Sequence, residues 1–183
     1  MGGPSRWFMA GFGFSTFSLA LLVDQVTKAL ILTQIVNPPR LIELWPMFNL
    51  TLVRNSGTAF GLFAAQSPLG VGALIAMTGL LSFGVLLWML RASSKPEAGA
   101  LGLILGGALG NLTDRLRHGA VTDFLDLHYG DYHWPSFNFA DVAITLGTAF
   151  LLFLSFRPVQ TYAASSRLEI SEEAESNRSN AKH

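Results

Sequence analysis

The segment PLGVGALIAMTGLLSFGVLLWML, residues 68–90, contains no charged side chain and begins at a proline. A helix needs about 20 predominantly apolar residues to cross the hydrocarbon core of a bilayer, and this segment is long enough. Arg91 ends the apolar run abruptly. The segment is therefore predicted to be a transmembrane helix, and the chain a membrane protein.

Three other stretches of low charge have a similar length. We expect helices at about residues 7–32, 98–116 and 139–157, of which the last two carry polar residues at one end. The predicted fold class is a mainly α membrane protein in which residues 1–160 form one domain of four transmembrane helices. The N-terminal stretch could instead be a cleaved signal peptide, but it lacks a persuasive small-residue cleavage site.

The composition excludes several classes of protein. Only 13% of the 183 residues are charged, whereas a soluble domain has roughly 25%. Twelve Lys and Arg balance twelve Asp and Glu, so there is no net positive charge to attract nucleic acid. The chain has no cysteine, which excludes disulfides, a thiol nucleophile and cysteine-bound zinc.

The positions of the basic residues predict the orientation in the membrane. Arg91 and Lys95 lie in the short connection between the second and third helices. Lysine and arginine are enriched in cytoplasmic loops, so we expect both termini in the cytoplasm. The polar tail, residues 161–183, is then expected to be a disordered cytoplasmic extension.

Two longer connections, at about residues 33–67 and 117–138, would lie on the extracytoplasmic side. Residues 41–44 and 48–54 of the first have β-branched and alternating character and are followed by a turn at Asn55, Ser56 and Gly57. A small extracytoplasmic β-sheet is therefore expected there.

The third helix combines a flat face with a polar end. Its glycines recur at every fourth position, at Gly102, Gly106 and Gly110. Such a face predicts close packing between transmembrane helices. Asn111, Asp114 and Arg115 follow as near neighbours on the helix surface. The alternative to a functional site is a structural Asp114–Arg115 pair.

Carboxylates gather at the outer ends of the third and fourth helices. Asp123 follows the third helix and Asp141 begins the fourth, so the two should share a depth at the membrane boundary. Ionisable groups at this depth mark a functional site by default. Asp141 could also be only a favourable charge at a helix start capped by Asn138. The residues alone do not choose Asp123 over Asp114 or Asp126.

Two carboxylates in a partly dry site share one proton, and such a pair can activate water and polarise an amide carbonyl. The other catalytic routes are weaker. There is no Gly-x-Ser-x-Gly motif, and His118, His128 and His133 lack the helical spacing of common metal sites. We therefore expect neither a metal nor a cofactor.

Asp24 and Lys28 lie four residues apart on the first helix. They could be a self-neutralised ion pair. Alternatively they could order the floor of the outer site, because the turn at Asn55 must return to the same membrane face.

These residues make the chain resemble the lipoprotein signal peptidases, the signal peptidase II family of membrane aspartyl proteases. The matching blocks are DQVTK at 24–28, NSGTAFG at 55–61, GGALGNLTDR at 106–115, GAVTDF at 119–124 and FNFAD at 137–141. The likeness spans about residues 15–157, and it agrees with four spans and a β-cradle outside the membrane.

The resemblance implies that Asp123 and Asp141 are the catalytic pair. It also implies a set of residues that bind substrate or support the site: Asp24, Lys28, Asn55, Gly57, Asn111, Asp114, Arg115 and Asn138. The implied reaction is removal of the signal peptide from a diacylglyceryl-modified prolipoprotein, by cleavage before the lipidated cysteine.

The implied partners are this prolipoprotein and membrane lipids, and the protein is expected to be a monomer in the bacterial inner membrane with its active site facing outward. The loop at residues 55–67 is expected to close beside the substrate. The alternatives are an ion or proton transporter using membrane carboxylates and a non-catalytic membrane scaffold. A transporter would place its charges near the bilayer midplane, which the sequence does not do.

Overall fold

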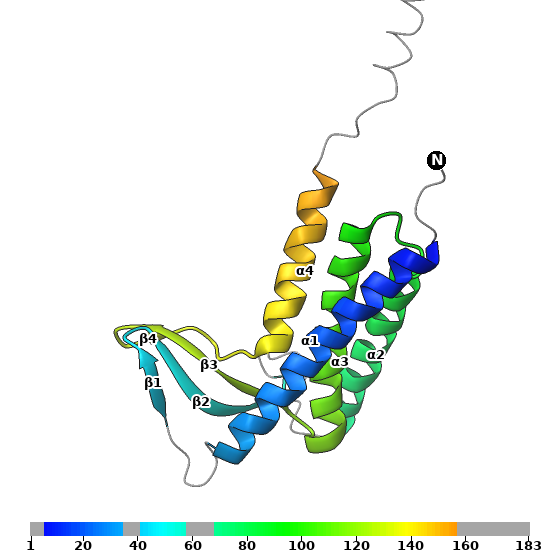
Figure 1. Ribbon diagram of the computed structural model, residues 1–183. Helices are drawn as coiled ribbons and strands as arrows, with labels where there is room; N and C mark the ends of the chain where they lie inside the picture. The colour runs from blue at the N-terminus through cyan, green and yellow to red at the C-terminus, as the bar shows by residue number, and fades with distance from the viewer. Residues whose placement is uncertain (1–5, 35–40, 58–67, 157–183) are drawn as a thin grey trace, which may run out of the picture.

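The structure is a computed structural model that describes residues 6–34, 41–57 and 68–156. Within these ranges the elements follow in the order α1 (Arg6–Gln34), β1 (Ile42–Trp45), β2 (Phe48–Asn55), α2 (Pro68–Met89), α3 (Lys95–His118), β3 (Val121–Tyr129), β4 (Tyr132–His133) and α4 (Phe139–Ser155). Four helices form a bundle, and the strands form a sheet at one end of it (Figure 1).

The helix at the centre of the bundle is α3, which packs against α1, α2 and α4. Its glycine face lies directly on α1: a β-carbon at Gly102 or Gly106 would collide with the α1 backbone, and one at Gly110 would collide with the Asp24 carboxylate. The small-residue spacing thus has the packing role predicted for it. It also brings the charged residues of α1 against α3.

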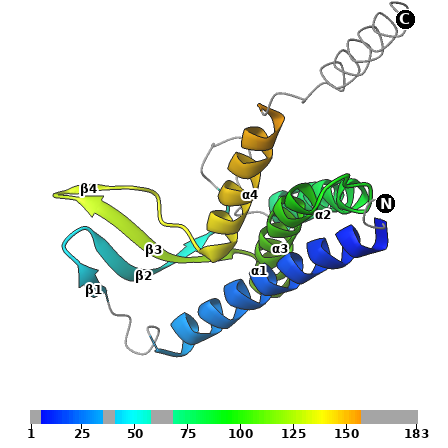
Figure 2. The ribbon, with the colours of Figure 1, turned by 45° about the horizontal axis from the view of Figure 1, so that its top comes forward.

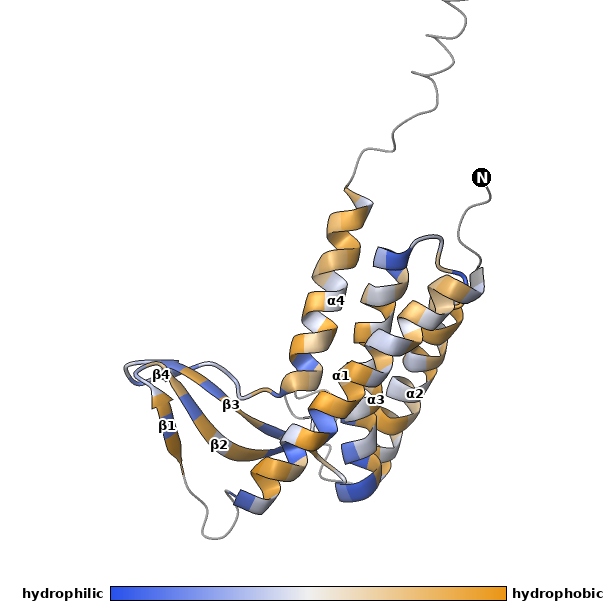
Figure 3. Ribbon diagram, viewed as in Figure 1, coloured by the Kyte–Doolittle hydropathy of each residue, from blue (hydrophilic) through white to orange (hydrophobic). Residues whose placement is uncertain are grey.

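Two of the described helices, Trp7–Gln34 and Pro68–Met89, are long and apolar enough to cross a membrane, and Phe139–Ser155 is a shorter apolar helix. In Figure 3 the helices are coloured mainly as hydrophobic along their lengths, hydrophilic residues lie at both ends of α3 and on the part of α1 next to the sheet, and the strands carry both kinds. The four expected helices are present, although α3 extends beyond both expected bounds and α4 ends two residues early.

The sheet contains more of the chain than the sequence predicted. Its order is β1-β2-β3-β4, and every neighbouring pair is antiparallel. The first two strands match the expected ones, but β3 and β4 come from the connection at 117–138, for which we expected no strand. Residues 121–126 of β3 are all buried, so this strand lacks the alternation that identifies a half-exposed one.

Short turns position the site at the junction of sheet and bundle. Gly119 ends α3 in the left-handed conformation, with φ of 70°, and its N–H bonds to Arg115 O. The chain can therefore leave α3 and enter β3 within a few residues. The start of α1, the α2–α3 connection and the end of α4 lie at the opposite end of the bundle (Figures 1 and 2). The expected tail at 161–183 and most of the expected closing loop lie outside the described residues.

Candidate active site

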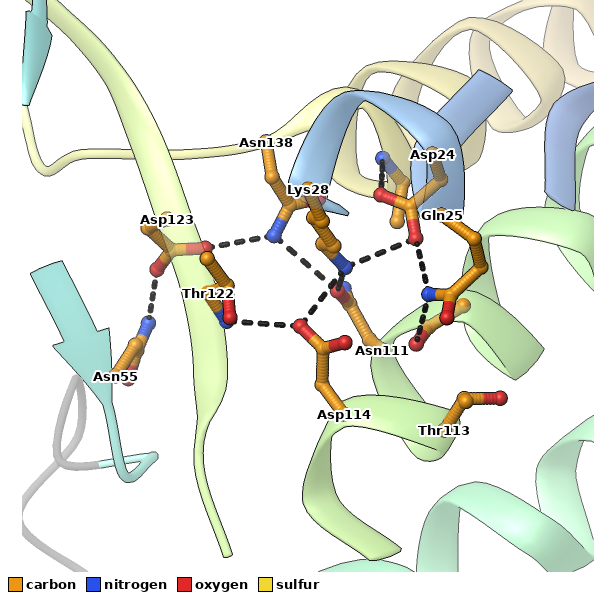
Figure 4. A network of polar contacts seen from close by, with 12 residues as sticks. Asp24, Gln25, Lys28, Asn55, Asn111, Thr113, Asp114, Thr122, Asp123 and Asn138 are labelled. Carbon is orange, nitrogen blue, oxygen red and sulfur yellow. Dashed lines mark hydrogen bonds and ion pairs between the residues drawn. The ribbon is translucent and has the colours of Figure 1, made fainter. Parts of the chain in front are cut away.

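Asp123 lies on β3 where the sheet meets the bundle, and it is 1% exposed. Its two carboxylate oxygens accept hydrogen bonds from Asn55 Nδ2 at 2.8 Å and Asn138 Nδ2 at 2.6 Å (Figure 4). The pKa of Asp123 is raised to about 6, chiefly by burial and in smaller part by the nearby Asp141 carboxylate, which together outweigh the lowering effect of the two amide donors and of Lys28. This carboxyl group therefore takes up a proton much more readily than an ordinary aspartate.

Asn138 joins Asp123 to Asp141. The side-chain oxygen of Asn138 accepts a hydrogen bond from Asp141 N at 3.1 Å, and the backbone N–H of Asn138 donates to Asp141 Oδ2 at 3.1 Å. These two hydrogen bonds form a capping box at the start of α4. The same side chain donates to Asp123. Asp141 is thus part of a helix cap, as the alternative interpretation of the sequence proposed. It is also linked to Asp123 through a single residue, Asn138.

Asn111 on α3 holds the other oxygen of Asp141. Its Nδ2 donates to Asp141 Oδ1 at 2.9 Å, while its Oδ1 accepts from Lys28 Nζ at 3.0 Å and from Asn138 Nδ2 at 3.2 Å. Because each atom of this amide has a defined partner, its orientation is fixed. The network therefore ties helices α1, α3 and α4 to both carboxylates.

Behind the amides lies a buried charge cluster. Lys28 Nζ is 2.9 Å from Asp24 Oδ2 and 3.2 Å from Asp114 Oδ2. Asp24 does more than neutralise Lys28. Its second oxygen accepts a hydrogen bond from Ala140 N in the first turn of α4, at 3.0 Å. The cluster links α1, α3 and α4 immediately behind the candidate site.

Sequence reasoning missed two members of this network. The N–H of Thr122 donates to Asp114 Oδ2 at 2.9 Å, so Asp114 fixes the strand residue beside Asp123. Gln25 Nε2 donates to Asp24 Oδ2 at 3.1 Å and contacts Gly110 O at 3.3 Å. Two signals were available for them: their adjacency in the chain to Asp123 and Asp24, and their places in the matching blocks at 119–124 and 24–28.

The remaining expected site residues occupy the edge of the network. The Arg115 guanidinium interacts electrostatically with Asp141, Asp123 and Asp114, and its buried Nε has no hydrogen-bond partner among the described residues. Gly57, with φ of 92°, donates its N–H to Asn55 Oδ1 at 2.8 Å. A side chain would strain this turn, so glycine allows Asn55 to point at Asp123.

Asp126, which the residues alone could not separate from Asp123, lies elsewhere. Its carboxylate contacts Asn49 and His133 on the opposite face of the sheet. Asp114, the other alternative, bonds with Lys28 and the backbone. Of the three, only Asp123 is connected with Asp141 through a shared amide.

An apolar groove opens beside Asp141. It has a volume of about 450 Å³, and its lining consists of Leu127, Trp134, Phe137, Asp141, Val142, Thr145 and Leu146. One carboxylate therefore faces a surface on which an apolar molecule could lie. No group of three or more histidine, aspartate or glutamate side chains in the described part of the chain is placed to hold a metal ion.

A helical membrane fold with two carboxylates linked through one amide defines a class, the membrane-bound aspartic peptidases. The family model for signal peptidase II matches residues 16–157. The chain belongs to the signal peptidase II family. This membership decides against the transporter and scaffold alternatives.

Individual relatives agree. The chain is 43% identical to a lipoprotein signal peptidase of Sphingopyxis alaskensis over 143 residues, which cover 77% of this chain and 83% of that one. It is 42% identical to a lipoprotein signal peptidase of Rhizorhabdus wittichii over 142 residues, covering 76% and 83%. A bacterial membrane enzyme solved at 1.9 Å has the same fold, with a TM-score of 0.70 and 26% identity over 81% of this chain and 95% of that one.

Proposed function

We propose that this chain removes the signal peptide of lipid-modified prolipoproteins, cutting before the lipidated cysteine, and that Asp123 and Asp141 are its catalytic pair. The observation that carries the residue assignment is the Asn138 side chain, which bonds to Asp123 and to the first turn of α4 that holds Asp141. Both carboxylates are thereby held at one junction of sheet and bundle.

The surroundings of the two carboxylates favour different protonation states. Both carboxylates accept hydrogen bonds on both oxygens, but only Asp141 lies in the first turn of α4, where a negative charge is favourable. Asp123 is buried, and its pKa is raised to about 6. In our proposal Asp123 therefore carries the proton of the resting pair and Asp141 is ionised.

The chemistry follows from this assignment. Asp141 accepts a proton from water, the resulting hydroxide attacks the scissile carbonyl carbon, and Asp123 donates its proton to the carbonyl oxygen. Collapse of the tetrahedral intermediate breaks the C–N bond: Asp141 gives its proton to the leaving amine nitrogen, and Asp123 takes back a proton from a hydroxyl of the intermediate, which restores the resting pair. Arg115 lies within electrostatic reach of both carboxylates and limits the cost of their charge.

The apolar groove beside Asp141 supports a substrate with an apolar segment. We propose that the protein acts as a monomer in the bacterial cytoplasmic membrane, with this groove on the extracytoplasmic side. The start of α1 and the end of α4 lie together at the far end of the bundle, which agrees with both termini in the cytoplasm (Figure 1).

The test is cleavage of a purified, lipidated prolipoprotein in detergent by the wild type, Asp123→Asn and Asp141→Asn. Asp131→Asn, in the exposed turn between β3 and β4, is the matched control. We expect activity in the wild type and the control only. Full activity in either catalytic-pair variant would remove that residue from the pair, and absence of wild-type activity would refute the proposed reaction.

A further inference from the structure

A second polar cluster lies on the face of the sheet opposite to Asp123. Side chains alternate along a strand, so Asp126 and His128 point away from the candidate active site. Asp126 is 5% exposed; Asn49 Nδ2 donates to it at 3.2 Å, and His133 Nδ1 lies 2.9 Å and 3.0 Å from its two oxygens. The His128 ring stacks on His133, with centroids 5.1 Å apart. We call these four side chains the Asp126 clasp.

The clasp adds a side-chain contact to a very short strand, and the next backbone hydrogen bonds to β3 after Trp134 are at Phe137, whose N–H donates to Leu125 O at 3.0 Å. The strand β4 consists only of Tyr132 and His133. After it, Trp134 N donates to Leu127 O at 2.8 Å, and Pro135 has no N–H to donate. Such a short strand is marginal by itself. The side-chain bond from His133 to Asp126 therefore supplements the few backbone hydrogen bonds of this strand.

The clasp adjoins the apolar groove. Trp134 and Leu127 both line the groove beside Asp141, and each is the immediate chain neighbour of a clasp residue. The clasp lies on one face of the hairpin and the groove on the other. A shift of His133 away from Asp126 would consequently move Trp134, which forms part of the groove wall.

We propose that the Asp126 clasp positions Trp134 for substrate binding: the hydrogen bond from His133 to Asp126 fixes the β3–β4 hairpin and thereby the wall of the groove. This makes His133 a positioning residue and Asp126 its anchor rather than a member of the catalytic pair. The inference rests on the proposed function, because it assigns the groove to the apolar part of the substrate.

The clasp operates in both protonation states of the imidazole. The imidazolium and the neutral tautomer with hydrogen on Nδ1 can each donate to a carboxylate. An asparagine amide nitrogen can occupy a similar position, whereas phenylalanine keeps the stacking ring and loses the donor. These two replacements separate the hydrogen bond from the bulk of the side chain.

The experiment compares wild type, His133→Phe, His133→Asn and the control His118→Phe, whose histidine is exposed at the end of α3. Cleavage of the lipidated prolipoprotein gives KM and kcat. We expect His133→Phe to raise KM about tenfold, as for the loss of one charge-assisted hydrogen bond, with kcat within about twofold. His133→Asn should restore most of the wild-type KM, and His118→Phe should equal the wild type.

Hydrogen exchange of the full-length enzyme supplies a readout that does not depend on activity. The amides of residues 127–137 should exchange faster in His133→Phe and return toward wild-type rates in His133→Asn. An unchanged KM or unchanged exchange in His133→Phe would overturn the proposal, and so would a fall in kcat at constant KM. Inactive wild type would refute the proposed reaction, and exchange would still decide whether the clasp holds the hairpin.

Discussion

Asp123 and Asp126 lie on the same strand, and both are buried, but their surroundings affect the carboxyl groups in opposite ways. The donors to Asp123 are the neutral amides of Asn55 and Asn138, so burial prevails and its pKa rises to about 6. Burial also disfavours ionisation of Asp126, but hydrogen bonds from His133 and Asn49 and the charge on the histidines outweigh it, and its pKa is lowered.

The difference shows that depth alone does not make a carboxylate reactive. Hydrogen bonds from an imidazole and an amide favour the ionised, accepting form of Asp126, which suits a structural anchor. Neutral amides orient Asp123 without fixing its charge, which suits a group that must hold and release a proton. The contrast can be tested by changing one side of it at a time.

The largest expected effect is on catalysis. Asp123→Asn should lower kcat by about 10³-fold or more, because the amide keeps the shape but cannot donate and recover the proton. Asp126→Asn should keep kcat within about twofold and raise KM, as a displaced groove wall would. Steady-state cleavage of the lipidated substrate distinguishes the two. Equal losses of kcat would remove the contrast between the carboxylates.

Removal of the buried cation behind the site should have the next largest effect. Lys28→Met leaves Asp24 and Asp114 without their shared partner, and breaking such a buried pair costs about 3–5 kcal/mol. The melting temperature in detergent should fall by roughly 10 °C. Lys95→Met, at an exposed position, is the control and should change little. An unchanged melting temperature for Lys28→Met would show that neutral partners suffice for these carboxylates.

Stability should respond to pH with opposite signs at the two positions. The raised pKa of Asp123 means that its contribution to stability is full below its ordinary value and is lost as pH rises through about 6. Between about pH 4 and pH 7.5 the stability of Asp123→Asn relative to wild type should therefore rise by about 2–3 kcal/mol, because only the wild type must bury an ionised carboxylate as pH rises.

The lowered pKa of Asp126 reverses this dependence. Its contribution is present above the ordinary pKa of an aspartate and is lost as pH falls. Asp126→Asn should melt below wild type at neutral pH, and the gap should narrow in acid. Thermal unfolding at several pH values measures both variants, and two curves with the same sign of pH dependence would contradict the contrast.

The smallest effect is expected in the pH profile of cleavage. Asn55 donates to Asp123 and lowers its pKa, so Asn55→Leu should raise that pKa. The alkaline limb of kcat/KM, where the pair loses its shared proton, should then move upward by less than about one pH unit. Ser56→Ala in the same turn should leave the limb in place. A downward shift would contradict the donor role of Asn55.

The sequence was informative where a long pattern existed. Apolar runs predicted all four helices, and the spacing of Gly102, Gly106 and Gly110 predicted the packed face of α3. The strands β3 and β4 were missed because residues 121–126 are buried on both faces, so no period of two is visible, and because β4 is only two residues long.

The candidate site was accessible only in part. The sequence predicted that Asp123 and Asp141 lie close together, at one membrane boundary, but the choice of Asp123 over Asp114 and Asp126 required the family resemblance. The contacts of Asp24 with Ala140 N and of Asp114 with Thr122 N involve backbone groups. Every residue except proline has a backbone N–H, so the residue types do not indicate these contacts. The link from α1 to the start of α4 could be seen only in three dimensions.

Asn138 places two demands on one position. It caps α4 with its oxygen and holds Asp123 with its nitrogen, and it is 0% exposed. Aspartate would supply the cap but not the donor, and a lysine would supply a donor but not the cap. An amide of this length meets both demands. A replacement of Asn138, in evolution or in engineering, therefore affects both the start of α4 and the position of Asp123.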